Sequence, residues 1–352
     1  MTTAADTAVE RGAPTPRERS VLLTVLYSDL FDYPLTADEV ARYRVALDGD
    51  DSDDDPGDAP ADGSVATTIE ELSGARLSRV DGYVCWRGRE DVVDLRRRRR
   101  AANAPRWRLA RRYARWLARA PFLRMVAVCG SQAMDNAGED GDVDVFCVTA
   151  PGRLWIAQAG AMVLRRLIPR SARICPNYFL SLDALGVAER NLFTAHEVAQ
   201  TVPLWGAEAY DRFLAANRWI HDFMPDLDLA DRRRFLGEEP RRPWLEKLLG
   251  GRLGDALDRA IHRLLLAYYA VRWRRHGLGR GDLERVYRRD RQGVVAGGYG
   301  PAVAEHFRRR VRQELDGAVP ESDLRRLFPP SENGRAAEPF DELFVRHYGT
   351  VS

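Results

Sequence analysis

The chain has 352 residues, enough for more than one domain, and its 45% hydrophobic and 30% charged residues are typical of a globular protein. The formal net charge of +2 excludes a general electrostatic attraction to nucleic acid or anionic membranes. No apolar run reaches the ~18 residues of a transmembrane helix, and the N-terminal residues lack the basic and then apolar pattern of a signal peptide. We therefore expect a cytoplasmic protein with no membrane partner.

The N-terminal residues predict a tail followed by helices. Residues 1–16 are polar and contain two prolines, so we expect a disordered tail. A first helix follows with apolar residues at helical spacing, and Thr36 forms a capping box with Glu39 that begins a second helix. Residues 48–63 hold eight aspartates with proline and glycine, which favours a disordered insertion over a metal site.

A β-hairpin belongs to the same N-terminal module, which we place at residues 17–120. The stretches 76–80 and 83–86 flank an Asp-Gly pair typical of hairpin turns, and a short helix is predicted at 68–73. Helices followed by a hairpin resemble a winged helix, a module that binds DNA in some proteins and contacts only protein in others. The module is therefore a candidate for nucleic-acid contact.

A basic helical segment, residues 89–119, links this module to the next part of the chain. It contains five consecutive arginines, Arg96 to Arg100, and Pro105 predicts a break in the helix. The arginines either contact phosphate or RNA, or form a solvated helix face in a chain where arginine replaces lysine. The sequence leaves both interpretations open.

Residues 121–190 predict a mixed α/β core within an α+β fold. Buried strands are expected at 124–129 and 142–149, and a third strand at 173–181 follows an apolar helix. Pro176 in the third strand indicates an edge position or a bulge. Short strands separated by helical segments predict a mixed sheet.

Residues 191–352 are predicted to form a helical C-terminal domain. Its clearest signal is a set of apolar residues at helical spacing, which we expect to face the core: Leu253, Leu257, Ile261, Leu264, Leu265 and Tyr268.

One stretch of the predicted core carries a chemical pattern. A buried strand ends in Gly130-Ser131, and ten residues separate Ser131 from Asp142-Val143-Asp144 at the start of the next strand. Residues i and i+2 of a strand project from one face, so the Asp142 and Asp144 carboxylates are expected side by side. Adjacent carboxylates repel each other unless a cation lies between them, and hard oxygen ligands suit Mg²⁺. Gly130 lets the backbone approach a ligand, and exposed N–H groups from Ser131 onward suit a triphosphate.

The arrangement of strand, Gly-Ser, short helix and strand with Asp-x-Asp resembles the nucleotidyltransferases related to DNA polymerase β, including the minimal and aminoglycoside nucleotidyltransferases. The resemblance covers mainly residues 122–182 and rests on Gly130, Ser131, Asp142 and Asp144. It implies a polymerase-β-like core that uses Mg²⁺ to transfer a nucleotide from an NTP to a hydroxyl group, with release of pyrophosphate. Gly130 and Ser131 would bind the nucleotide, while Asp142 and Asp144 would bind the metal and act in catalysis. We expect a small-molecule or protein acceptor rather than long RNA, because the chain lacks a strong basic charge.

The family often supplies a third carboxylate from the next strand, but residues 173–181 contain no acid. Asn177 occupies a corresponding position, although an amide is a poor general base. Asp183 lies just beyond the strand, and in related small-molecule enzymes an acid on a later helix deprotonates the acceptor. On that resemblance we assign Glu197 to catalysis. The alternatives are that Asp183 fills the role, that two carboxylates suffice or that catalysis is lost.

Further residues have a functional and a structural interpretation. Arg153, at the start of a helix, either approaches the phosphates of the nucleotide or lies at the surface. Trp155, Trp205 and Trp219 either stack on a base or belong to the core. His196 is interpreted as a structural residue or as part of the rim of the site.

Two other functions remain open from the sequence. In the first, the winged-helix-like module binds nucleic acid, and a degenerate nucleotidyltransferase core senses nucleotide without turnover. In the second, the chain is an enzyme that modifies a protein. Specific DNA binding without pyrophosphate release would identify the first, and transfer of label from an α-labelled NTP to a protein would identify the second.

Overall fold

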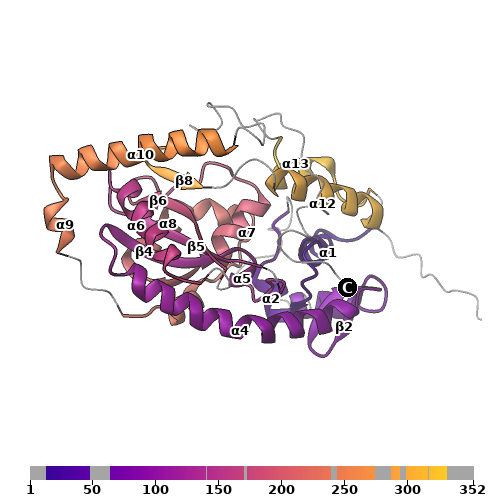
Figure 1. Ribbon diagram of the computed structural model, residues 1–352. Coiled ribbons are helices and arrows are strands. Elements are labelled where there is room, and N and C mark those ends of the chain that lie inside the picture. Colours follow the sequence, from indigo (N-terminus) through magenta and orange to yellow (C-terminus); the bar gives the residue numbers. More distant parts are fainter. Residues whose placement is uncertain are drawn as a thin grey trace, which may run out of the picture.

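The computed structural model describes residues 13–47, 64–139, 141–169, 173–238, 244–273, 287–293, 299–315 and 317–330. Within them the chain is an α+β protein with a mixed five-stranded sheet and a small three-stranded antiparallel sheet (Figure 1). The expected α+β class with a mixed sheet is thus confirmed. The predicted acidic insertion at 48–63 and most of the predicted tail lie outside the described residues.

The N-terminal unit combines three helices with the small sheet: α1 (Pro16–Asp29), β1 (Leu35–Thr36), α2 (Ala37–Arg42), α3 (Val65–Leu72), β2 (Leu77–Val80) and β3 (Tyr83–Trp86). β3 lies between β1 and β2. The predicted capping box of Thr36 with Glu39 and the predicted hairpin are both present. The hairpin turns at Asp81 and Gly82, whose φ angles of 51° and 84° match the two positive angles of a type I′ turn.

α4 (Asp91–Leu117) is one continuous helix, so the break predicted near Pro105 does not occur. Proline lacks an N–H and removes one hydrogen bond to the preceding turn. Contacts on both sides of the proline hold the helix together. Asn103 donates to the carbonyl of Ala137, and Trp107 Nε1 donates to the carboxylate of Asp135. Tertiary contacts therefore override the local tendency to break.

The large sheet has the strand order β7 (Val202–Trp205), β4 (Leu123–Cys129), β5 (Val143–Thr149), β6 (Ile174–Ser181) and β8 (Arg291–Gly293). β5 and β6 run parallel, whereas the other neighbours run antiparallel. The register between β5 and β6 shifts between Val145 and Phe146, and β8 pairs with β6 from Tyr178 onward. Pro176 therefore lies at a bulge, on a part of β6 that the described residues of β8 do not reach, as its missing N–H requires.

Helices connect and cover these strands: α5 (Gly130–Ala133), α6 (Leu154–Arg166), α7 (Leu192–Gln200), α8 (Ala207–Ala216), α9 (Leu245–Leu248), α10 (Arg252–Trp273), α12 (Tyr299–Leu315) and α13 (Glu321–Leu327). Two 3₁₀ turns, η3 (Arg218–Asp222) and η4 (Ala230–Phe235), follow α8. The prediction of a wholly helical region after residue 190 is wrong, because β7 and β8 complete the sheet. All four residues of β7 are buried, so no alternation marks this strand in the sequence.

Two apolar clusters occupy the opposite faces of the large sheet. Met125, Phe146 and Leu180 belong to a cluster that continues through α7 and α8 into α1 and α12. Val126 and Cys147 belong to the other cluster, which includes residues of α4 and α6 and is covered by α10. The N-terminal unit and one face of the sheet thus share a core, while α6 and α10 cover the other face (Figure 1).

α10 lies along the outside of the molecule (Figure 1). The apolar stripe that the sequence assigns to the core is divided between two faces of this helix. Ile261 and Leu265 pack against the apolar cluster that contains Val126 and Cys147. The remaining four are exposed: Leu253, Leu257, Leu264 and Tyr268. Within the described part of the chain, no helix combines the length and the apolar character needed to cross a membrane.

Candidate functional site

The antiparallel pair of β4 and β5 brings the two halves of the Gly-Ser and Asp-x-Asp motif to one edge of the sheet. Cys129 at the end of β4 pairs with Asp144 in β5. Gly130 and Ser131 begin α5 directly after this pair, and Asp142 precedes β5 at the same edge. Asp142 is exposed and Asp144 is partly buried. The fold therefore brings these four predicted residues together.

Gly130 allows the close approach between the turn and the Asp144 carboxylate. Its φ angle of +64° lies in the left-handed region, which costs a residue with a side chain about 1–2 kcal/mol. A Cβ atom at this position would lie 3.1 Å from Oδ2 of Asp144, closer than nearly all such contacts. Both the backbone conformation and the neighbouring carboxylate thus favour glycine here.

Glu197 joins this group from α7. The strand that follows α7 pairs with β4, so that Val202 lies opposite Val128, one residue before the end of β4. The last turns of α7 therefore approach the edge of the sheet that holds the motif. Burial raises the pKa of Glu197 to about 7. A carboxylate on a helix thus lies close enough to Asp144 to affect its pKa.

Two carboxylates of this site, those of Asp144 and Glu197, are poorly solvated. Burial, and then the negative charges of Asp142 and Glu197, raise the pKa of Asp144 to about 7. Burial, and then the charges of Asp144 and Glu197, also raise the pKa of the Cys129 thiol well above its usual value. Burial and nearby negative charges both disfavour the ionised form of an acid and so raise its pKa. A cation would relieve the repulsion.

The donor set fits a hard divalent cation that the protein shares with a ligand. Asp142 and Asp144 offer carboxylate oxygens, and Mg²⁺ is commonly bound by one or two carboxylates together with water and substrate phosphates. The described residues contain no group of three His, Cys, Asp or Glu side chains placed to hold an ion by themselves. Phosphate and water oxygens would therefore have to complete the coordination.

One face of α4 holds the loop that joins α5 to β5. Asn103 Nδ2 donates to the carbonyl of Ala137 (2.9 Å), and the Arg106 guanidinium donates to the carbonyl of Gly138 (2.8 Å). With Trp107, these residues lie three and four positions apart, on one side of the helix. The sequence interpretation missed this role, because polar residues at helical spacing are hard to distinguish within a basic run.

The same loop is tied to the N-terminal unit. Arg99 donates to Oδ1 of Asn136 (3.1 Å), and Nδ2 of Asn136 donates to the carbonyl of Phe31, just after α1 (2.8 Å). The backbone N–H of Asn136 donates to the carbonyl of Ser131 (2.9 Å). A continuous series of hydrogen bonds thus connects the N-terminal unit with the Gly-Ser turn.

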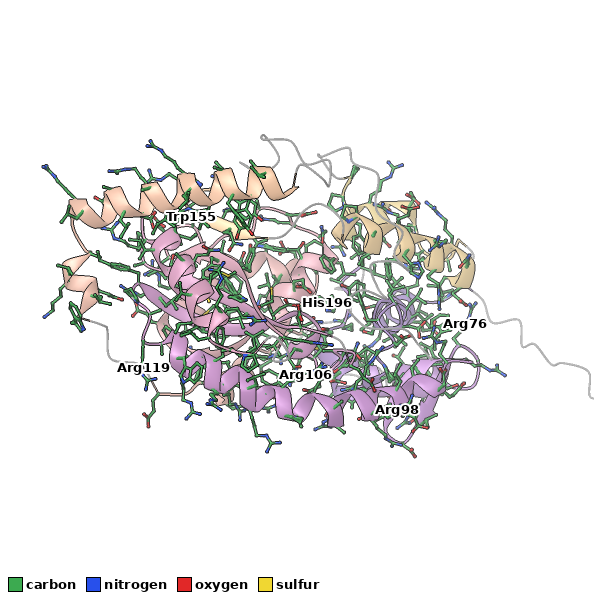
Figure 2. All side chains as sticks on the ribbon, viewed as in Figure 1. Arg76, Arg98, Arg106, Arg119, Trp155 and His196 are labelled. Atoms are coloured by element: carbon green, nitrogen blue, oxygen red, sulfur yellow. The ribbon has the colours of Figure 1, made fainter. Side chains whose placement is uncertain are left out.

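The arginine run divides between two sides of α4. Arg96 is buried and forms a bidentate ion pair with Glu39 (2.7 and 2.8 Å), and Arg99 is also buried. These two hold the N-terminal unit, a role that neither sequence interpretation includes. The exposed members are Arg97, Arg98 and Arg100, and Figure 2 labels Arg98.

Arg153 does not belong to the site, which corrects the expectation that it approaches the phosphates. It follows β5 at the end opposite to Asp144 and is buried. Its guanidinium donates to the Asp255 carboxylate (2.5 Å) and to the carbonyls of Leu249 (3.1 Å) and Gly250 (2.9 Å). Arg153 therefore fixes the start of α10 against the sheet.

The structural interpretation holds for the other candidates. Asp183 lies beyond the same distant end of the sheet and accepts a hydrogen bond from Ser181. The tryptophans considered for base stacking are all buried: Trp155, Trp205 and Trp219. Figure 2 shows Trp155 beneath α10.

His196 is a core residue. Its ring stacks on that of Tyr27 at 4.3 Å between centroids, and burial lowers its pKa to about 3. Figure 2 shows it in the middle of the molecule, between the large sheet and the N-terminal unit. The side chain of Asn177 lies outside the part of the chain that the structure describes.

The candidate site is recognised by the chemistry of its side chains and not by a depression in the surface. A depression of about 500 Å³ lies between the β2–β3 hairpin and α12, and its lining includes Arg76, Trp86 and Glu314. None of the motif residues lines it. Comparisons with protein-family models, with curated proteins and with solved structures give no match to this chain.

Proposed function

We propose that the chain is an Mg²⁺-dependent nucleotidyltransferase, which transfers a nucleotide from an NTP to a hydroxyl group and releases pyrophosphate. The observation that carries this proposal is the convergence of Gly130, Ser131, Asp142, Asp144 and Glu197 at one edge of a mixed sheet. The order of strand, short helix, strand, helix and parallel strand resembles the core of the polymerase-β-like enzymes. The helices and strands of the N-terminal unit likewise resemble a winged helix in their order.

The residues divide the chemistry between them. Asp142 and Asp144 would hold the metal ion, which supplies charge neutralisation at the phosphate oxygens. Backbone N–H groups from Ser131 onward would bind the triphosphate, beside Gly130, where no side chain intrudes. The acceptor hydroxyl oxygen bonds to the α-phosphorus, the bond from that phosphorus to the β-phosphate breaks, and pyrophosphate leaves. The Glu197 carboxylate takes the hydroxyl proton, and a pKa of about 7 suits a general base near neutral pH.

A hydroxyl on a small molecule or a protein is the acceptor that the charge distribution favours. DNA-binding modules of this type place the helix before the hairpin in the major groove. In this chain that helix is α3, and its exposed side chains include Glu70 and Glu71. Carboxylates repel phosphate, and two of the five consecutive arginines are buried in ion pairs and hydrogen bonds. The alternative of a nucleic-acid-binding regulator is therefore the weaker proposal.

Pyrophosphate release tests the proposed activity directly. The full chain would be incubated with each NTP, Mg²⁺ and candidate hydroxyl acceptors, and the release of pyrophosphate and transfer of α-phosphate label would be followed. Asp142→Asn and Asp144→Asn should each abolish both signals. Asp183→Asn, a carboxylate change at the distant end of the sheet, should leave them unchanged. Transfer that persists in both site variants would contradict the assignment.

A further inference from the structure

The outer face of α10 carries an uninterrupted heptad pattern. Six residues follow each other at alternating spacings of four and three positions: Leu253, Leu257, Ala260, Leu264, Ala267 and Val271. This spacing is that of the a and d positions of a coiled coil, and it keeps all six on one narrow side of the helix. All six are exposed in the described chain. We call this row the α10 seam.

The opposite side of α10 already has its contacts. Oδ1 of Asp258 accepts hydrogen bonds from the backbone N–H groups of Trp155 (2.9 Å) and Ile156 (3.0 Å) at the start of α6. The ring of His262 stacks on that of Trp155 at 4.5 Å between centroids. These contacts fix the rotation of α10, so the seam is held toward the solvent, along the outside of the molecule (Figure 1).

The exposure of the seam is large for apolar side chains. Leu253 is 77% exposed, Leu264 70% and Val271 72%. The exposed large apolar side chains of the described chain all lie in α6, α9, α10 or directly beside them. A concentration of apolar surface in one region of a protein marks an interaction site.

In the central part of the seam, the sizes of the side chains match those of a second seam that runs antiparallel to the first. With a two-fold axis at residue 262, Leu257 faces Ala267 of a second copy, and Ala260 faces Leu264 of that copy. Each of these layers combines one leucine with one alanine, so a large side chain meets the space left by a small one. Alanine also allows the two helix backbones to approach closely. The outermost layer pairs leucine with valine.

We propose that α10 is a self-association helix, which packs antiparallel against α10 of a second copy of this chain. The seam is about 27 Å long at 1.5 Å per residue, which gives a limited and reversible interface. Arg263 is exposed beside the centre of the seam, so its two copies lie near each other across the two-fold axis. Their repulsion weakens as salt is added, and apolar contacts do not, so association should strengthen with ionic strength. An acidic partner protein would show the opposite salt dependence.

Exchanging the residues of one layer tests both the association and its register. The mass of the full chain would be measured by sedimentation over a wide concentration range, for the wild type, Ala260→Leu, Leu264→Ala and the double variant. Each single change should weaken the dimer, because one places leucine against leucine and the other leaves alanine against alanine. The double variant restores one leucine and one alanine per layer and should recover most of the affinity.

Ala102→Leu provides the matched control, because it also changes an exposed helical alanine to leucine, but on α4. It should leave the dimer unchanged. Melting temperatures should be similar for all variants at concentrations where each is monomeric, since the altered side chains are exposed. A wild-type chain that stays monomeric throughout, or a double variant no better than the single variants, would overturn the proposal. Neither outcome bears on the nucleotidyltransferase site.

Discussion

Gly130 and Asp144 approach each other across the adjoining ends of β4 and β5, so closely that a Cβ atom at position 130 would lie 3.1 Å from Oδ2 of Asp144. The contact joins the two halves of the motif. It places a side-chain-free turn next to the more buried of the two aspartates, where a phosphate group would need access to a metal ion. Both the neighbouring carboxylate and the positive φ angle therefore favour glycine at position 130.

Replacing Gly130 by alanine should abolish nucleotide transfer and lower the free energy of unfolding by about 1–2 kcal/mol, the cost of a side chain at positive φ. Gly152→Ala is the matched control. Its φ of +66° is nearly that of Gly130, but a Cβ there would meet no atom within 4 Å. Both variants should lose similar stability in thermal unfolding, while only Gly130→Ala loses activity. Equal activity in the two variants would show that the Asp144 contact is irrelevant.

The stability of the chain should depend on pH through Asp144. Its pKa rises on folding from the ordinary value of 3.8 to about 7, because burial and neighbouring negative charges disfavour the ionised form. The folded state therefore binds a proton that the unfolded state has released, and this contribution is complete below pH ~4 and lost as the pH rises through ~7. It amounts to at most about 4 kcal/mol at 1.36 kcal/mol per unit.

Asp144→Asn removes this titration and should be more stable than the wild type at pH 8, but not at pH 4. Denaturant unfolding across this range would measure the difference. Asp183→Asn, at an exposed position, should follow the wild-type profile. Parallel profiles for the wild type and Asp144→Asn would mean that the Asp144 carboxyl is well solvated in the folded chain.

Replacing Glu197 by glutamine should separate catalysis from nucleotide binding. The amide cannot accept the acceptor proton, so turnover should fall by about 10²–10⁴-fold, the usual contribution of a general base. The affinity for the NTP should change little, because the metal-binding aspartates remain. The wild-type rate should rise with pH through about 7, as Glu197 ionises, and the variant should lose this dependence. Loss of NTP affinity equal to the loss of turnover would assign Glu197 to binding instead.

The contact between α4 and the loop should matter for nucleotide binding. Asn103 and Asn217 are both fully buried, and each donates to two backbone carbonyls, one of them four residues earlier in the chain. Replacing either by alanine should cost about 1–3 kcal/mol of stability. Only Asn103→Ala frees the loop at Ala137, and it should weaken NTP binding about tenfold. Equal NTP affinity in both variants would limit Asn103 to a structural role.

Local signals in the sequence predict local structure well. The Asp-Gly pair predicts the hairpin, and the spacing of Thr36 and Glu39 predicts the start of α2, because each depends on residues a few positions apart. The motif could also be placed at one edge of a sheet from sequence. A short connection between consecutive strands commonly makes them adjacent, and the two strands here flank Gly130 and Asp142.

Features that depend on distant parts of the chain could not be predicted in this way. Pro105 does not end its helix, because loop residues that follow β4 support both sides of it. Arg153 binds Asp255, more than a hundred residues later, instead of a phosphate. The apolar stripe of α10 contains residues of two faces, and only the contacts of α10 with α6 determine which face is inside.

The most direct test of the proposed site is isothermal titration of the full chain with each NTP, with and without Mg²⁺, repeated on the Asp142→Asn/Asp144→Asn variant. If the site is a nucleotidyltransferase centre, the wild type binds an NTP only when Mg²⁺ is present, and the double variant loses this binding while it remains folded. Binding of no NTP by the wild type, or Mg²⁺-dependent binding that survives in the double variant, would contradict the assignment of these two aspartates.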